Sequence, residues 1–252
     1  INPKLIEEKI TDKTKAIIPV HFYGQPADMP AIMQIATKHQ LQVLEDCAQA
    51  HGAEIAGKQV STWGDCASFS FYPSKNLGAY GDAGGMATDN DAIAEKARRI
   101  ANHGQLGKHD HTIEGRNSRM DSIQAAALST KLTYLPAWTE RRIQNALAYT
   151  QALENTEIHT PKTRMNSKHV FHLYVIRTQN RDALQKKLQE KGVQTAIHYP
   201  SALPFLPCYA QLGFTEKDFP VSWQFQKETL SLPMYAELTA EQIIYIKNIV
   251  LQ

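Results

Sequence analysis

The 252-residue sequence has little of what marks several protein classes. It holds only three cysteines, an odd number without the spacing of a metal site, which predicts a reducing, cytoplasmic setting. No apolar run approaches the roughly 18 residues that a membrane helix needs. Its 27 basic and 25 acidic side chains leave a net charge of +2, so we expect binding neither to nucleic acid nor to a membrane.

Two familiar phosphate-binding patterns are also missing. The four glycines of residues 78–85 do not follow the Rossmann fingerprint, and no P-loop occurs in the sequence. A flexible turn would explain this glycine cluster, and so would close approach of the backbone to a cofactor. His109 and His111 flank an aspartate, but two ligands without a third are a weak metal signal, and we expect no metal.

What is present is the composition of a globular protein, with 42% hydrophobic and 21% charged residues. The helical pattern from Asp28 to His39 separates two apolar segments. Buried strands are predicted over residues 15–22, 41–47, 66–72 and 84–89. Strands alternating with helices predict an α/β fold with a mostly parallel sheet, whose functional residues gather at the carboxyl ends of the strands.

The pattern changes near residue 137. The segment from Ser118 to Glu154 is mostly helical, with an interruption at Leu135 and Pro136. The elements predicted after it are strands over 169–176 and 193–199, a helix over 180–192, and a last helix opened by a capping box of Thr239 and Gln242. We therefore expect a large domain, residues 1–137, and a small C-terminal α+β domain, residues 138–252.

Asp46 closes the predicted strand 41–47. Burying a carboxylate there is costly unless it meets a cation, although a capping or loop aspartate is the plainer explanation for this residue alone. Gln49 and His51 follow on the same turn and offer hydrogen-bond donors to a ligand at that end of the strand.

Lys75 follows the strand 66–72 and a proline turn. A single loop lysine is usually a surface residue, but partial burial would lower the pKa of its amine and make it a nucleophile and a base. Ser70 could hold a phosphate, although serine after a strand is common. Together with Asp46, these residues match the needs of pyridoxal phosphate, which requires a lysine for its Schiff base and an acid against its pyridinium nitrogen.

Four ordered motifs then resemble a known family. They are VLEDCAQAHGA (43–53), SFSFYPSKNLGAYGDAGG (68–85), NSRMDSIQAAAL (117–128) and TAIHYP (195–200). Together they resemble the DegT/DnrJ/EryC1/StrS family, the sugar aminotransferases of the fold-type I pyridoxal-phosphate class. The resemblance implies an aspartate-aminotransferase-like large domain and a small C-terminal α+β domain.

The resemblance also implies roles for the matching residues that bind the cofactor. Lys75 would form the Schiff base and shuttle protons, and Asp46 would face the pyridine nitrogen. Gln49 would lie by the ring hydroxyl, and Ser70 would hold the phosphate. The related sugar dehydratases carry histidine at the position of Lys75, so the lysine argues for an aminotransferase.

Other matching residues imply a homodimer with shared active sites. Asn117 would reach the phosphate from the neighbouring subunit, although it could also simply cap a helix. Arg119, His198 and Tyr199 match positions that line the nucleotide-sugar pocket in the family. For His198 and Tyr199, which end a predicted strand before a proline, a structural turn is the default explanation.

The implied reaction is a ping-pong transamination. L-Glutamate would give its amino group to the cofactor and leave as 2-oxoglutarate, and a keto group of a nucleotide-linked sugar would then accept the amine. The sequences of these motifs most resemble those of members that act at C3 of a 3-keto sugar, with C4 amination as the main alternative. A truncated, non-catalytic homologue that serves as a partner subunit is the rival from another class.

The family's members are longer than this sequence. Residue 1 aligns with a helix inside their large domain, so we expect an N-terminal segment to be missing here. In the family that segment carries a Gly-Thr or Gly-Ser phosphate cup, the residue that stacks on the cofactor ring, and flanking strands of the sheet.

Overall fold

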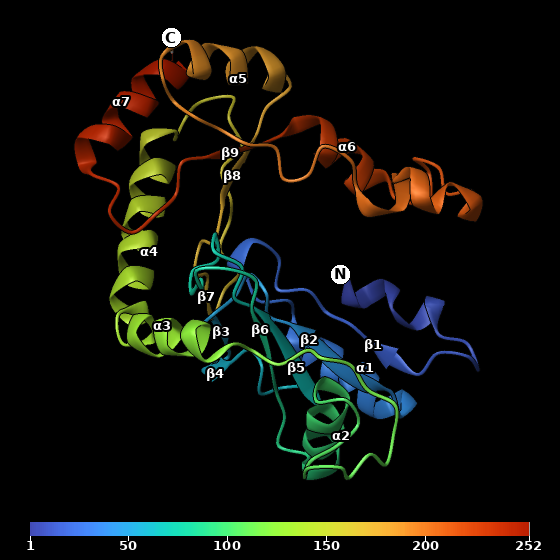
Figure 1. The fold of residues 1–252 in the computed structure, drawn as a ribbon. Coiled ribbons are helices and arrows are strands. Elements are labelled where there is room, and N and C mark those ends of the chain that lie inside the picture. The colour runs from blue at the N-terminus through green and yellow to red at the C-terminus, as the bar shows by residue number, and fades with distance from the viewer. Residues whose placement is uncertain (252) are drawn as a thin grey trace. The chain divides into compact units, whose positions relative to one another are not determined.

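The computed structural model describes residues 1–251 and separates them into two units (Figure 1). The first unit consists of Ile1–Glu140 and Thr163–His172. The second consists of Arg141–Lys162 and the described residues from Leu173 onward. No helix within residues 1–251 combines the length and apolarity that crossing a membrane requires.

A four-stranded sheet organises the first unit. Its strands, in spatial order, are β1 (Ala16–Ile17), β2 (Gln42–Asp46), β5 (Cys66–Ser70) and β6 (Gly84–Ala87). The first three run parallel and β6 runs antiparallel to β5, which confirms the mostly parallel α/β sheet. Asp46 pairs with Ser68 in the register of β2 and β5, so the carboxyl ends of these two strands lie side by side.

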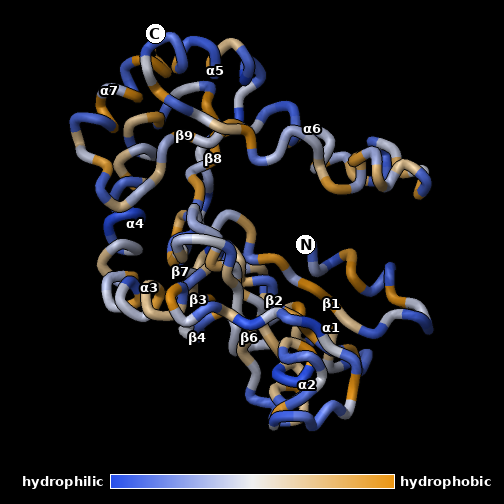
Figure 2. Tube along the Cα trace, in the orientation of Figure 1, coloured by the Kyte–Doolittle hydropathy of each residue, from blue (hydrophilic) through white to orange (hydrophobic). Residues whose placement is uncertain are grey.

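Helices and a small second sheet complete the first unit. The helices are α1 (Met29–His39), α2 (Asp91–Ala101), α3 (Ser122–Leu132) and the start of α4 (Leu135–Ala152), and the second sheet joins β3 (Glu54–Ile55), β4 (Lys58–Gln59) and β7 (Ser167–Lys168). Asp28 caps α1 as predicted, because its Oδ1 accepts from the backbone of Ala31. The buried face of α1 packs with Ile17 and Val43 of the strands. The tube in Figure 2 is hydrophobic along β1 and largely hydrophilic at α2.

The second unit is built on an antiparallel pair of strands. Its elements are the rest of α4, β8 (Tyr174–Arg177), α5 (Arg181–Glu190), α6 (Pro220–Glu228), β9 (Thr229–Leu232) and α7 (Ala240–Leu251). The buried rings of Tyr149 and Tyr174 stack with centroids 5.0 Å apart. Thr239 and Gln242 form the predicted capping box, with backbone-to-side-chain distances of 2.9 and 3.3 Å.

Three predicted strands are corrected. The strand over 15–22 is limited to β1 and an isolated bridge at Val20. The strand over 169–176 begins only at Tyr174, because the residues before it bond to the first unit, where Val170 donates to the carbonyl of Gly24 at 3.0 Å. The strand over 193–199 is reduced to a single bridge between Ala196 and Ser231.

Candidate active site

Asp46 ends β2 with its backbone held from two sides. Its N–H donates to the carbonyl of Pro19 at 2.9 Å, and its own carbonyl accepts from the N–H of His21 at 3.1 Å. The side-chain Oδ1 accepts from the N–H of Ala48 at 2.9 Å, which bends the chain away from the strand. The carboxylate lies at the carboxyl end of the sheet, the usual place for ligands in such folds.

Lys75 lies on the turn that follows β5. Its N–H donates to the carbonyl of Tyr72 at 2.8 Å, and its side chain is half-buried. Burial lowers the pKa of Lys75, while the negative charge of Asp46 acts in the opposite direction. The amine is therefore easier to deprotonate than that of a surface lysine. It also interacts electrostatically with the carboxylate of Asp46, its predicted partner at the site.

Ser70 is the last residue of β5. Its Oγ accepts from the N–H of Tyr72 at 3.3 Å, and Ser70 itself pairs with Gly84 in the sheet. The hydroxyl proton is not used in this contact, so Ser70 can still donate to an anion. The turn that follows is tight, because a Cβ at Gly78 would lie 2.4 Å from the carbonyl oxygen of Pro73.

Gln49 and His51 occupy the turn after Asp46 and are both buried. The Oε1 of Gln49 accepts from the N–H of Tyr23 at 2.7 Å. The ring of His51 packs beside those of Phe69 and Phe71, with centroids 5.6 Å from each, and the two phenylalanine rings stack on one another. Within residues 1–251, neither nitrogen of His51 has a hydrogen-bond partner. Burial lowers the pKa of His51 to about 4, and the positive charge of Lys75 acts in the same direction.

Asn76 is a residue of this region that the sequence did not single out. It follows Lys75 and is buried, and its Nδ2 donates to the carbonyl of Val170 at 3.1 Å. Its Oδ1 lies 3.1 Å from Nδ1 of His172. Its position next to Lys75 was the only signal available, because its partners are more than ninety residues away in the chain.

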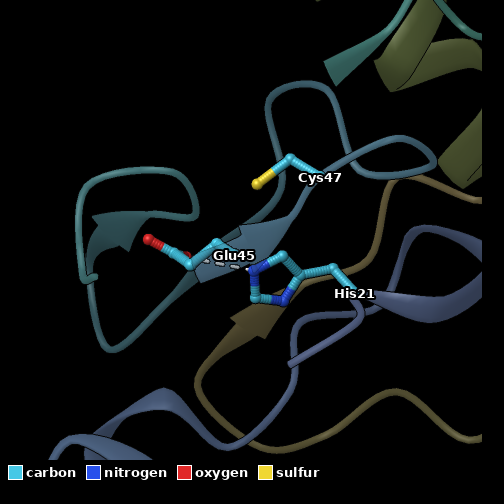
Figure 3. Close-up of side chains that lie close together, drawn as sticks. All are labelled: His21, Glu45 and Cys47. Carbon is cyan, nitrogen blue, oxygen red and sulfur yellow. Dashed lines mark hydrogen bonds and ion pairs between the residues drawn. The ribbon is translucent and has the colours of Figure 1, made fainter. Parts of the chain in front are cut away.

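A second missed group lies behind Asp46, on the other face of β2. His21, Glu45 and Cys47 are all buried, and their ligand-type atoms lie within 4.8 Å of one another (Figure 3). The spacing suits a metal, but both nitrogens of His21 and both oxygens of Glu45 already have hydrogen-bond partners. Burial also raises the pKa of the Cys47 thiol, which disfavours the thiolate that a metal would bind. We therefore interpret this group as structural.

Asn117 and Arg119 lie in the exposed segment that follows α2. Asn117 forms an isolated bridge with Asn102, and Nη1 of Arg119 donates to Oδ1 of Asn102 at 3.0 Å. These contacts hold the segment to the end of α2. The roles of both residues toward a neighbouring subunit stay predictions.

His198 and Tyr199 belong to the second unit. The Nδ1 of His198 lies 2.7 Å from Oγ of Ser231 on β9, and the side chain of Tyr199 is 48% exposed. The contact with Ser231 orients the His198 ring, and the assignment of both residues to a sugar pocket stays a prediction.

A cavity of about 670 Å³ lies elsewhere in the first unit, along β6 and α2. Its walls include Gly84, Gly85, Ala94 and Ala97, and none of the predicted site residues lines it. The candidate site therefore rests on the chemistry of Asp46 and Lys75.

The profile of the DegT/DnrJ/EryC1/StrS aminotransferase family matches residues 1–251. A protein of Geobacillus stearothermophilus named "pleiotropic regulatory protein" is 49% identical over 98% of the chain and 67% of its own length. A dTDP-3-amino-3,6-dideoxy-alpha-D-galactopyranose transaminase of Aneurinibacillus thermoaerophilus is 45% identical over 96% of the chain and 66% of its own length. The chain thus spans about two thirds of the length of these curated relatives.

Solved structures agree with the fold. The crystal structure of S. venezuelae DesV in complex with a ketimine intermediate superposes with a TM-score of 0.96 at 39% identity, over 99% of this chain and 68% of that one. Other structures of this fold were solved in a pyridoxal-phosphate form or with bound pyridoxamine phosphate.

The donor set described above fits pyridoxal phosphate. A lysine with a lowered pKa can react with the aldehyde, and an acid within its electrostatic reach can bind a protonated ring nitrogen. The unpartnered imidazole of His51 marks a buried polar position in the same region.

Proposed function

The chain belongs to the DegT/DnrJ/EryC1/StrS aminotransferase family, and from that premise we propose that it transfers an amino group to a nucleotide-linked keto sugar with pyridoxal phosphate. L-Glutamate is the proposed donor and 2-oxoglutarate the proposed co-product. Within this class we propose C3 of a 3-keto-(6-deoxy)hexose as the acceptor position. The 3-amino sugar in the name of the 45%-identical relative supports this choice.

One observation carries the proposal. The pKa of Lys75 is lowered by burial, and the charge of Asp46 acts on the same amine. A half-buried lysine and an acid at the carboxyl end of one parallel sheet match the Schiff-base lysine and the acidic partner of the ring nitrogen in pyridoxal-phosphate sites. A purely structural role gives no reason to combine them.

The cofactor supplies an electron sink for the carbanion formed at the substrate carbon. Asp46 would hold a proton on the pyridine nitrogen, and the turn at Ala48 fixes its carboxylate. Lys75 would hold the cofactor through its amine and would serve as the base that moves the proton of the substrate carbon. Gln49 orients the ring hydroxyl, and Ser70 binds the phosphate as a hydroxyl donor.

The substrate pocket is proposed to be shared within a homodimer. Asn117 and Arg119 are exposed on the segment after α2, where a second subunit can reach them. Arg119 is suited to a phosphate or a carboxylate of the nucleotide sugar because its guanidinium binds both in a bidentate manner. His198 and Tyr199 are proposed to complete the sugar pocket.

The half-reaction with L-glutamate tests the proposal. The protein is loaded with pyridoxal phosphate and mixed with L-glutamate, and 2-oxoglutarate is quantified together with the visible absorbance. We expect one equivalent of 2-oxoglutarate per site and loss of the visible band. A protein that binds the cofactor and yields no corresponding 2-oxo acid with L-glutamate or any other amino acid would contradict the assignment.

A non-catalytic role is the second candidate, and the name of the 49%-identical relative favours keeping it. A partner subunit or regulator would need the fold and its surface but no reactive lysine. Cofactor content and intact mass of the purified protein separate the two candidates, because a stable 28 kDa species without pyridoxal phosphate supports the regulatory one.

A further inference from the structure

We infer that Glu45, which His21 holds in place, is a positioning residue for Asp46 and puts a buried net charge of −1 behind its strand. The inference rests on the proposed function, since it concerns how Asp46 holds a protonated ring nitrogen. Figure 3 shows the pair with its dashed contact and with Cys47 beside it.

Glu45 has four hydrogen-bond donors, two at each oxygen. Oε2 lies 3.0 Å from Nε2 of His21 and accepts from the N–H of Ser61 at 2.9 Å. Oε1 accepts from the N–H groups of Trp63 and Gly64 at 2.8 and 2.9 Å. Burial alone would raise the pKa of Glu45, but these hydrogen bonds outweigh it and hold the pKa below the ordinary value. Glu45 is therefore an anion in the folded protein.

His21 does not neutralise that anion. Its Nδ1 accepts from the N–H of Ala27 at 3.0 Å, and a ring nitrogen that accepts a hydrogen bond carries no proton. The single ring proton is then on Nε2, which donates to Glu45. The imidazole is neutral, and the pair keeps the charge of the carboxylate.

The pair is connected to Asp46 through the backbone. His21 donates its own N–H to the carbonyl of Asp46, so one residue holds both Glu45 and its neighbour. Successive side chains of a strand point to opposite faces, which puts Glu45 behind β2 and Asp46 on the other face. The anion favours a cation at Asp46, because the negative charge of the buried Glu45 adds to that of the adjacent Asp46. The cation in question is the protonated ring nitrogen of the cofactor.

The test compares Glu45→Gln with a matched control on the same strand. Asp65 also uses a carboxylate to hold β2, since its Oδ2 accepts from the N–H of Val43 at 2.7 Å, so Asp65→Asn removes a similar charge without touching Asp46. Each protein binds pyridoxamine phosphate labelled with ¹⁵N in its ring. The ring-nitrogen chemical shift reports its protonation, and a titration gives the dissociation constant.

We expect Glu45→Gln to move the ring-nitrogen shift toward the unprotonated form and to weaken binding roughly tenfold, with Asp65→Asn close to wild type in both readouts. A folded Glu45→Gln protein with the wild-type shift and affinity would overturn the inference while leaving the proposed function intact. Wild-type protein that binds no pyridoxamine phosphate would instead overturn the proposed function itself, and the inference with it.

A second variant separates the charge of Glu45 from the ring of His21. His21→Gln retains an amide donor for Glu45 and preserves the charge of the pair, while it gives up the ring nitrogen that accepts from Ala27. We expect its ring-nitrogen shift to match that of wild type. Loss of ring-nitrogen protonation in His21→Gln would contradict the charge-based account.

Discussion

The side chain of Asn76 donates a hydrogen bond to the carbonyl of Val170 at 3.1 Å, although the two residues are 94 positions apart. Asn76 directly follows Lys75, so this contact and the one to His172 fix the turn that carries the reactive amine. The segment that reaches back from residue 163 to 172 is thereby part of the site's support.

Asn76→Ala is expected to lower the free energy of unfolding by about 1–3 kcal/mol, because it removes two buried hydrogen bonds, one to the carbonyl of Val170 and one to the ring of His172. We also expect slower covalent capture of pyridoxal phosphate, followed by stopped-flow absorbance. Asn90→Ala is the control, since Asn90 also makes two hydrogen bonds but only caps α2. Equal capture rates in the two variants would show that Asn76 does not position Lys75.

Asp46→Asn is expected to slow the half-reaction with L-glutamate about 100-fold or more, because an amide cannot stabilise a protonated ring nitrogen as a carboxylate does. Asparagine keeps the oxygen that accepts from Ala48, so the turn should persist and the protein should stay folded. Single-turnover formation of 2-oxoglutarate measures the rate. A variant that reacts as fast as wild type would remove Asp46 from the site.

Glu45 should make the protein sensitive to acid. Its pKa in the folded protein lies below 4.5, so its stabilising effect is fully present above pH 4.5 and is lost as the pH falls through the folded value. At pH 7 we expect Glu45→Gln to cost about 3 kcal/mol, because the amide nitrogen of glutamine would face two of the four donors that the carboxylate now accepts from. Urea unfolding at pH 7 and at pH 3.5 checks this. The difference between the two proteins should shrink at the lower pH, and a constant difference would contradict the assignment.

Two buried histidines make the folding stability depend on pH over a higher pH range than Glu45 does. Burial lowers the pKa of both His51 and His169 to about 4. Between pH 6.5 and 4 these two histidines are protonated in the unfolded chain but stay neutral in the folded protein. The free energy of unfolding therefore falls as the pH is lowered through this window. Each histidine contributes on the order of 3 kcal/mol to this loss.

The matched test replaces one histidine at a time by glutamine and follows urea unfolding between pH 7 and pH 4. His51→Gln and His169→Gln should each flatten the dependence of stability on pH. NMR titration of the His51 ring with a midpoint near 6.5 would refute the buried, neutral state.

Much of the first unit could be predicted from the sequence because its signals are local. The apolar runs of β2 and β5, the cap at Asp28 and the capping box at Thr239 each depend on residues close in the chain. Asp46 and Lys75 could be proposed because Asp46 ends one such strand and Lys75 lies on the turn after the other.

The parts that could not be predicted depend on distant partners. The segment 169–172 has the pattern of a strand but bonds to Gly24 and Asn76 instead. Glu45 looks like a second strand-end acid until the donors from the loop at 61–64 are known. No local pattern in the sequence contains these contacts.

The central claim is that Lys75 is the residue that binds pyridoxal phosphate, and covalent trapping tests it most directly. The loaded protein is reduced with borohydride and digested, and the peptides are sequenced by mass spectrometry. We predict that the pyridoxyl phosphate group is found on Lys75 and is absent from Lys75→Ala treated in the same way. Label on another lysine, or equal labelling of the Lys75→Ala protein, would contradict the account.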